Sequence, residues 1–494
     1  MISSGPPFRL NAQHFAAFGD RLALRSKTDA LTYAQLSDRA QRVANVLGDL
    51  GVSPGEPVGL VSSGRAFDES IGLVGILLHG AVVVPFDATA PPARWAAIAK
   101  ARGVRVFVHD EPARAHVEQA EVHTGRTLGR VCLDGTGGIL ATARGAEAGE
   151  ELVLNPALAC ILHTSGTTGG PKPVPITWAG LDAFTRFMID LVGLSEHDKV
   201  LRVAELVFDL SWFDHVATWR RGATLCTMAR RDLATGKALL TAMKSLEPTV
   251  VYGVPSMFMK LGSVCGETDL RPAPRAILYA GEVFPPRELL GFASKVPESR
   301  LWNLYGPTET NVCTFYEVDR GKLDGEAETP IGLACPYARC WLVEEGNRAQ
   351  VIEGVGIGEL VVEGPTTVGG GPHATGDRVE RKADGFYYFR GRIDRMIKVR
   401  GYRVEPGEVE MALEKHEWVR QAAVVVHDDV RLGKTLRAFV AVGDQLAHAD
   451  ERSLRIYLAE MLPAYMVPER IVCLEELPRT VTGKVDYRAL EGTG

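Results

Sequence analysis

Residues 162–174, LHTSGTTGGPKPV, concentrate backbone amides, hydroxyl groups and one lysine in a segment with few large side chains. Glycine lets the backbone approach a ligand closely or adopt a positive φ. A loop of this kind can wrap a polyanion such as a triphosphate through amide and hydroxyl donors. It is not a Walker A loop, because G-x-x-x-x-G-K-[ST] is absent, and a flexible surface turn is the alternative interpretation. The candidate ligands of the polyanion are Thr164, Ser165, Gly166, Thr167, Thr168, Gly169 and Lys172.

A second polar group follows a strand-like segment in residues 302–310, WNLYGPTET. Glu309 can hold Mg²⁺, which prefers a carboxylate combined with phosphate oxygens. Tyr305 can stack on a purine base, and Asn303 can hydrogen-bond the edge of that base. An ordinary Gly-Pro turn is the alternative interpretation of this segment taken alone.

Two further segments carry single charged residues in or beside turns. Asp377 lies in ATGDRV, residues 374–379, where a carboxylate can pair with ribose hydroxyls as carboxylates do elsewhere. Lys484 lies in LPRTVTGKVDYRAL, residues 477–490, in a glycine-bearing turn near the C-terminus. Taken singly, each of these charged residues is more often a solvated surface group.

Asp209 lies between Phe208 and Leu210 in residues 207–214, VFDLSWFD. A carboxylate among apolar neighbours is costly to bury unless a cation or hydrogen-bond donors pair with it. An aspartate at the start of a helix is the alternative interpretation.

Composition places the chain among ordinary globular proteins and argues against several other classes. It has 494 residues, with 46% hydrophobic and 23% charged. The net charge of −6 disfavours a general nucleic-acid binder, although residues 395–403 form a local basic segment. No basic start precedes an apolar run at the N-terminus, and His79 and Gly80 interrupt the most apolar stretch, so we expect no membrane association. Eight cysteines without a Cys-x-x-Cys pair are typical of a cytoplasmic protein with reduced thiols.

Apolar segments of strand length alternate with segments of helical period over most of the first 390 residues, which predicts an α/β fold with parallel-rich sheets. Residues 330–390 change to short strands and turns, which indicates a small antiparallel β unit. We therefore predict an N-terminal core at residues 1–393 and a small α+β domain at 394–494. The predicted strands are 57–63, 81–86, 104–110, 158–164, 199–206, 249–255 and 275–282, and the predicted helices are 33–51, 179–193 and 235–246.

In this order and spacing, the four polar segments resemble the adenylate-forming superfamily, which includes acyl-CoA synthetases, luciferases and the adenylation domains of nonribosomal peptide synthesis. Residues 31–47, 80–94 and 458–471 also look like motifs of this family, so the resemblance covers almost the whole chain. It implies that a carboxylate attacks the α-phosphorus of ATP, giving an acyl-adenylate and pyrophosphate, and that a thiol then takes the acyl group. ATP and Mg²⁺ are the cofactors that it implies.

The resemblance also implies a role for each motif residue. The loop at 164–172 would hold the β- and γ-phosphates, and Lys484 would bridge the substrate carboxylate and the α-phosphate, where negative charge builds up. The C-terminal domain would rotate about Asp394, so that one orientation inserts Lys484 and the other presents Gly401 at the entry of a phosphopantetheine arm. The remaining implied contacts are Asn303 and Tyr305 with adenine, Thr308 with the α-phosphate, Glu309 with Mg²⁺, and Asp377 and Arg392 with the ribose.

In the amino-acid-activating branch that the chain resembles, the aspartate of a Phe-Asp-x-Ser pattern faces the substrate ammonium, so Asp209 favours an amino acid over a simple acyl acid. The other matching pocket positions carry no charge and one hydroxyl, which predicts a small or medium uncharged side chain, with alanine as the first guess. Apolar pockets discriminate by only about 1–3 kcal/mol per methylene, so the exact substrate stays open. These positions are Asp209, Leu210, Phe213, Ser256, Leu278, Ala280, Leu304, Val312 and Cys313.

Residues 208–214 and 278–284 look somewhat like D-alanine–carrier protein ligases and like stand-alone enzymes that supply α- or β-amino acids to polyketide pathways. Because the sequence ends soon after Lys484, we expect the thiol to come from a separate acyl or peptidyl carrier protein. The basic segment 395–403 suits an acidic carrier or CoA phosphates, or else forms a solvated face. The sequence departs from the common family pattern at His163, at Pro173 and in the short segment before Asp377. It therefore does not determine how the edge of the nucleotide site is closed.

Three alternatives remain: an acyl- or aryl-CoA synthetase, a β-amino acid–carrier protein ligase, and a catalytically silent partner of another ligase. The combined presence of Glu309, Asp377 and Lys484 argues against the silent partner. The sequence does not determine the amino acid, its stereochemistry, the carrier or the oligomeric state.

Overall fold

The structure is a computed structural model that describes residues 6–63, 66–135, 138–143, 145, 154–165, 171–266, 269–399, 401–429, 433–442, 450–479 and 485–491. Two of the predicted functional groups, Lys484 and residues 166–169 of the phosphate loop, lie outside these residues. Within them, no helix is both long enough and apolar enough to cross a membrane.

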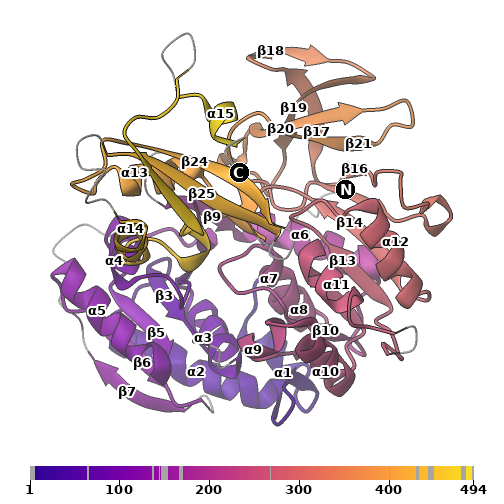
Figure 1. Cartoon of the computed structure of the whole chain (residues 1–494). Helices are drawn as coiled ribbons and strands as arrows, with labels where there is room; N and C mark the ends of the chain where they lie inside the picture. The colour runs from indigo at the N-terminus through magenta and orange to yellow at the C-terminus, as the bar shows by residue number, and fades with distance from the viewer. Residues whose placement is uncertain are drawn as a thin grey trace.

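Two parallel-rich sheets form the large N-terminal part of the molecule, as the alternation of apolar segments predicts (Figure 1). The first sheet has the order β7-β6-β5-β3-β4-β8-β9, with antiparallel pairing only at its two edges. Its strands are β3 (Pro57–Val61), β4 (Val82–Pro85), β5 (Val106–Asp110), β6 (Gly129–Leu133), β7 (Ile139–Ala143), β8 (Leu158–Thr164) and β9 (Lys172–Thr177).

The second sheet has the order β16-β15-β14-β13-β12-β10-β11-β1-β2, and its six central strands run parallel. The largest apolar cluster draws side chains from both sheets, so they share one core. The strands are β1 (Leu22–Arg25), β2 (Ala30–Thr32), β10 (Lys199–Leu201), β11 (Thr224–Cys226), β12 (Val250–Gly253), β13 (Ala276–Tyr279), β14 (Arg300–Tyr305), β15 (Thr314–Glu317) and β16 (Leu333–Ala334).

Helices cover these sheets, and their ends follow local sequence signals. Thr32 and Gln35 form a capping box at the start of α2, and Gly193 ends α6 in the left-handed conformation. The helices of this part are α1 (Ala12–Ala16), α2 (Tyr33–Asp49), α3 (Ala66–His79), α4 (Pro92–Arg102), α5 (Arg114–Thr124), α6 (Trp178–Val192), α7 (Leu210–Trp212), α8 (Thr218–Arg220), α9 (Arg230–Leu233), α10 (Gly236–Leu246), α11 (Pro255–Gly262) and α12 (Pro286–Lys295), with a π-helix at Phe213–Ala217.

An antiparallel sheet follows, and it confirms the small β unit expected at residues 330–390. Its order is β18-β17-β19-β20-β21, and it projects at the upper right in Figure 1. The strands are β17 (Arg339–Glu344), β18 (Asn347–Ile352), β19 (Gly356–Glu363), β20 (His373–Arg381) and β21 (Tyr387–Arg392).

The C-terminal segment begins with a hairpin of β22 (Ile397–Val399) and β23 (Tyr402–Val404), which is followed by a three-stranded sheet and three helices. These elements, coloured orange to yellow in Figure 1, lie across the N-terminal part and beside the antiparallel sheet. They are β24 (Gln421–Asp429), β25 (Gly433–Ala441), β26 (Arg470–Leu474), α13 (Pro406–Leu413), α14 (Glu451–Ala459) and α15 (Tyr487–Glu491).

The strand predicted at 199–206 is wrong beyond Leu201. β10 pairs with its neighbours only over residues 199–201, and the chain then leaves the sheet. The amide of Arg202 makes one more hydrogen bond, to the carbonyl of Cys226 at 2.9 Å, and its guanidinium pairs with Glu69 of α3 at 2.7 Å.

Candidate active site

One large cavity lies where the parallel strands end. Ligands of open α/β sheets bind outside the carboxyl ends of the strands. The cavity has a volume of about 1540 Å³, more than the roughly 300–1000 Å³ typical of a pocket for one small ligand. Its wall includes residues that lie one or two positions after β4, β8, β10, β12 and β13, namely Phe86, Ser165, Val203, Val254 and Ala280.

The two ends of the phosphate-loop candidate lie side by side. β8 pairs with β9 in antiparallel fashion up to Thr164 opposite Lys172. Thr164 and Ser165 are buried in the cavity wall, whereas Lys172 is exposed. The Oγ of Ser165 donates a hydrogen bond to the carbonyl oxygen of Arg403, at 3.0 Å.

A tight turn after β14 places Glu309 beside the cavity, in contact with Arg403 of its wall. Gly306 is required there, because a Cβ at this position would lie 1.7 Å from the carbonyl oxygen of Asn311. Asn311 itself adopts a positive φ of 51°, and the amide of Cys313 closes the turn by donating to the carbonyl of Tyr305 at 2.8 Å. The turn leaves Glu309 only 3% exposed and Thr308 on the cavity wall.

The ribose candidates are held together by strand pairing. Asp377 of β20 lies directly opposite Arg392 of β21, and their charged groups approach to 2.7 Å. Tyr305 donates its hydroxyl to the Asp377 carboxylate, and the Nε of Arg392 donates to the hinge candidate Asp394 at 2.8 Å. The amide nitrogen of Asn303 donates to the carbonyl of Pro330 at 2.7 Å, so this N–H is already in use.

Asp209 lies at the start of α7 and lines the cavity. Although it precedes a helix, its side chain makes no capping hydrogen bond within the described residues, which disfavours the helix-start interpretation. Burial raises the pKa of Asp209 to about 6, and the positive charge of Lys398 opposes that rise. The site therefore contains a carboxylate that a buried cation would stabilise.

The predicted side-chain pocket is only partly exposed to the cavity. The backbone amide of Ser256 donates to the Glu282 carboxylate at 2.9 Å. Phe213, Leu278 and Cys313 are fully buried and do not line the cavity themselves, so they act on the pocket only by packing against residues that do. The positions that line the cavity directly are Asp209, Leu210, Ser256, Ala280, Leu304 and Val312.

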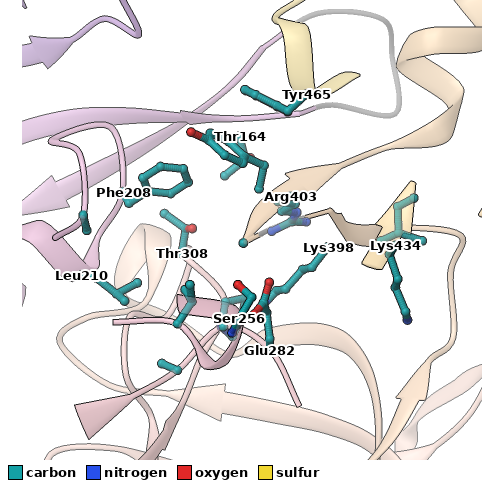
Figure 2. A pocket seen from close by; sticks show the side chains of 18 of the residues that line it. Thr164, Phe208, Leu210, Ser256, Glu282, Thr308, Lys398, Arg403, Lys434 and Tyr465 are labelled. Carbon is teal, nitrogen blue, oxygen red and sulfur yellow. Dashed lines mark hydrogen bonds between the residues drawn. The ribbon is translucent and has the colours of Figure 1, made fainter. Parts of the chain in front are cut away.

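The β22–β23 hairpin inserts two cations into the cavity. Lys398 lies directly opposite Arg403 in the antiparallel register, so both side chains point to the same face of the hairpin. Figure 2 shows them entering the cavity together, with Lys398 directed toward Glu282 and Ser256. Burial lowers the pKa of Lys398, whereas Asp377 and Asp209 oppose this effect. At the hairpin turn, Gly401 has a φ of 84° and approaches Val254 of the core.

Sequence reasoning assigned these two cations to the surface segment 395–403 and missed their place in the site. Period-two alternation along the hairpin is the signal that could have placed them on one face. Arg403 donates two hydrogen bonds to Glu309, at 2.9 and 2.7 Å. Burial alone would raise the pKa of Glu309, but the Arg403 charge holds it below its usual value.

The donor set fits the predicted Mg²⁺. Among the described residues, no group of three or more His, Cys, Asp or Glu side chains is arranged to hold a metal ion. Glu309 is nevertheless a buried carboxylate that carries a cation here, and Mg²⁺ is commonly bound by one carboxylate together with substrate phosphates. Glu309 would therefore hold the ion, which neutralises phosphate charge when bound.

Comparisons with known proteins identify the family to which the chain belongs. Residues 11–370 match the model of the AMP-binding enzyme family, and residues 408–484 match that of the AMP-binding enzyme C-terminal domain. An L-proline–[L-prolyl-carrier protein] ligase of Pseudomonas fluorescens is 34% identical, with 96% of each chain covered. One of the same name from Streptomyces coelicolor is also 34% identical, over 94% of this chain and 92% of the relative. The amide bond synthetase McbA of Marinactinospora thermotolerans has the same fold, with a TM-score of 0.84, 22% identity, and coverage of 97% of this chain and 98% of McbA.

Proposed function

Because the chain belongs to the family of AMP-binding enzymes, we propose that it activates the carboxylate of an amino acid with ATP and passes the aminoacyl group to a thiol. Asp209 is the single observation that carries the proposal. A carboxylate in the wall of a nucleotide cavity suits a substrate that has a carboxylate at one end and an ammonium group at the other.

The adenylation step follows from the positions of the cavity residues. Asp377 and Arg392 would orient the ribose, and Tyr305 would lie beside the adenine. The loop at 164–172 would hold the outer phosphates, while the ammonium group pairs with Asp209 and aligns the substrate carboxylate with the α-phosphorus. Lys484 would neutralise the charge that develops there.

The amino acid is proposed to be small or medium and uncharged. Apart from Asp209, the predicted pocket positions that line the cavity are apolar except for Ser256, so they offer no charged partner to a substrate side chain. Two relatives at 34% identity are named as L-proline ligases, which makes proline the first amino acid to test. Alanine, of the size that the sequence favours, is the second, and its β-isomer tests the position of the amine.

The acceptor is proposed to be the phosphopantetheine thiol of a separate carrier protein. The hairpin brings Gly401 against the core beside the substrate pocket, which leaves space for a narrow arm where a larger side chain would protrude. The two proline ligases are named for transfer to a carrier protein.

ATP–pyrophosphate exchange with a panel of amino acids and their deaminated analogues tests this proposal. We expect exchange with an uncharged amino acid and at least tenfold less with the analogue that lacks the amine. Equal exchange with the analogue would instead indicate an acyl- or aryl-CoA synthetase. A folded protein that exchanges with no acid would indicate a catalytically silent partner.

A further inference from the structure

The segment that carries Asp209 has open space beside it on more than one side. Residues 202–215 run from the end of β10 into the π-helix and include Asp209 together with two more positions of the predicted pocket. Val203, Glu205 and Val207 of this segment line the large cavity. The same three residues also line a second cavity of about 50 Å³. Close packing alone therefore does not fix this segment as it fixes a strand in the core.

A single carboxylate contacts both ends of the segment. At its start, the guanidinium of Arg202 pairs with Oε1 of Glu69 at 2.7 Å. At its end, Nε2 of His215 lies 3.9 Å from the same oxygen atom. Glu69 is only 8% exposed, and it belongs to α3, the helix between β3 and β4 of the first sheet. The segment follows a strand of the second sheet, so Glu69 joins it to a helix of the other sheet.

The imidazole of His215 connects this contact to the turn beside Asp209. Burial lowers the pKa of His215 to about 3, so the ring is neutral, and its Nδ1–H donates to the carbonyl of Ser211 at 2.8 Å. The hydroxyl of Ser211 in turn donates to the carbonyl of Phe208 at 2.7 Å. The amide of Trp212 donates to the carbonyl of Asp209 at 3.2 Å. A continuous set of contacts thus leads from Glu69 to the residue that faces the substrate.

The ion pair of Glu69 and Arg202 fixes a geometry more than it adds stability. Burial raises the pKa of Glu69, and the charge of Arg202 opposes that rise. A buried ion pair often contributes little net stability, because desolvation offsets the attraction between the charges. A guanidinium and a carboxylate nevertheless pair in few orientations, so the start of the segment is held in one place.

We propose that Glu69 is a positioning residue for the amino-acid substrate, because by holding Arg202 and His215 it sets the place of the Asp209 carboxylate. The inference rests on the proposed function, in which Asp209 pairs with the substrate ammonium. Glu69 does not line the large cavity, so it acts only through the segment. Without it, the segment could shift into the second cavity and draw Asp209 away from the ammonium. A displacement of about 1 Å can cost on the order of 10² in rate.

A double-mutant cycle of Glu69→Gln and Asp209→Asn tests this role, because a residue that acts through Asp209 loses its effect once the Asp209 charge is gone. The readout is kcat/KM for the best amino acid in ATP–pyrophosphate exchange. We expect Glu69→Gln to lower it about tenfold in the wild-type background, through the KM for the amino acid and not the KM for ATP. In the Asp209→Asn background the same change should lower it less than about twofold.

Ile76→Val is the matched control, because it removes one buried methylene from the same helix. It should lower the Tm and leave both KM values unchanged. If Glu69→Gln fails to fold, Glu69→Met combined with Arg202→Met takes its place in the cycle with the same expectations, since this pair leaves no buried charge without a partner.

Hydrogen–deuterium exchange of the full chain, followed by mass spectrometry, examines the segment without any substrate. Peptides that cover residues 202–215 should exchange at least about fivefold faster in Glu69→Gln than in Ile76→Val. Equal losses of kcat/KM in the two backgrounds, an unchanged kcat/KM in the wild-type background, or unchanged hydrogen exchange in the segment overturns the inference. If the segment exchanges faster but the wild type shows no pyrophosphate exchange with any amino acid, Glu69 still holds the segment and the proposed function fails.

Discussion

Replacing Asp209 by asparagine tests the electrostatic basis of substrate choice, because the substitution keeps the size of the side chain and removes its charge. The pKa of Asp209 is about 6 in the buried site. At pH 8, holding this carboxyl group neutral costs about 2.7 kcal/mol, at about 1.36 kcal/mol for each of roughly two pH units. Binding of a substrate without an ammonium group would require either that Asp209 becomes neutral, at this cost, or that its charge stays buried without a partner. The wild type should therefore discriminate against such a substrate about hundredfold.

The assay is pyrophosphate exchange at pH 8 with the best amino acid and its deaminated analogue, for example proline and cyclopentanecarboxylate. Removing one partner of a buried charge pair typically costs about 2–5 kcal/mol. We therefore expect Asp209→Asn to lower kcat/KM for the amino acid by about 10²–10³-fold and to bring the ratio between the two acids close to one. Asp190→Asn, on the exposed side of α6, is the control and should leave both values unchanged. An Asp209→Asn variant that keeps the wild-type ratio would refute the reasoning.

Three further predictions address other parts of the site. Lys484→Ala should slow pyrophosphate exchange by about 10²–10³-fold while ATP binding, followed by calorimetry, stays measurable; an unchanged exchange rate would refute its assignment. The KM for the amino acid should rise about tenfold per pH unit below pH 6, because the raised pKa of Asp209 makes its carboxyl neutral there, and a KM that is flat between pH 5 and 7 would contradict this. Gly306→Ala should lower the Tm by several degrees and abolish exchange, since its Cβ would overlap the carbonyl of Asn311, whereas Gly291→Ala in α12 has free space and should be tolerated.

Local chemistry explains why much of the fold and several site residues could be predicted from the sequence. The turn that carries Glu309 is specified by neighbouring residues, above all Gly306, and strands that end at the cavity, such as β4 and β13, are continuous apolar segments. The alternation of such strands with helical segments correctly predicted the parallel-rich sheets. Division of the chain at residues 393 and 394 stays a prediction, although the connection between β21 and β22 falls there.

Long-range contacts explain what the sequence could not reveal. Arg403 and Glu309 are 94 positions apart, and no local signal links them. The basic segment could be interpreted as a solvated face because the carboxylates that compensate its charges belong to other elements of the chain. Asp209 and Asp377, which face Lys398, are two of them. The ion pair between Arg202, next to β10, and Glu69 of α3 likewise joins positions that no local signal links.

Isotope transfer from the substrate tests the central claim most directly. An amino acid labelled with ¹⁸O in both carboxylate oxygens is incubated with the enzyme, ATP and hydroxylamine as the acceptor, and the AMP is analysed by mass spectrometry. Attack of the carboxylate on the α-phosphorus predicts that each AMP carries one ¹⁸O atom, because the carbon–oxygen bond of the anhydride breaks in the second step. Unlabelled AMP, or label found in phosphate instead, would contradict the account.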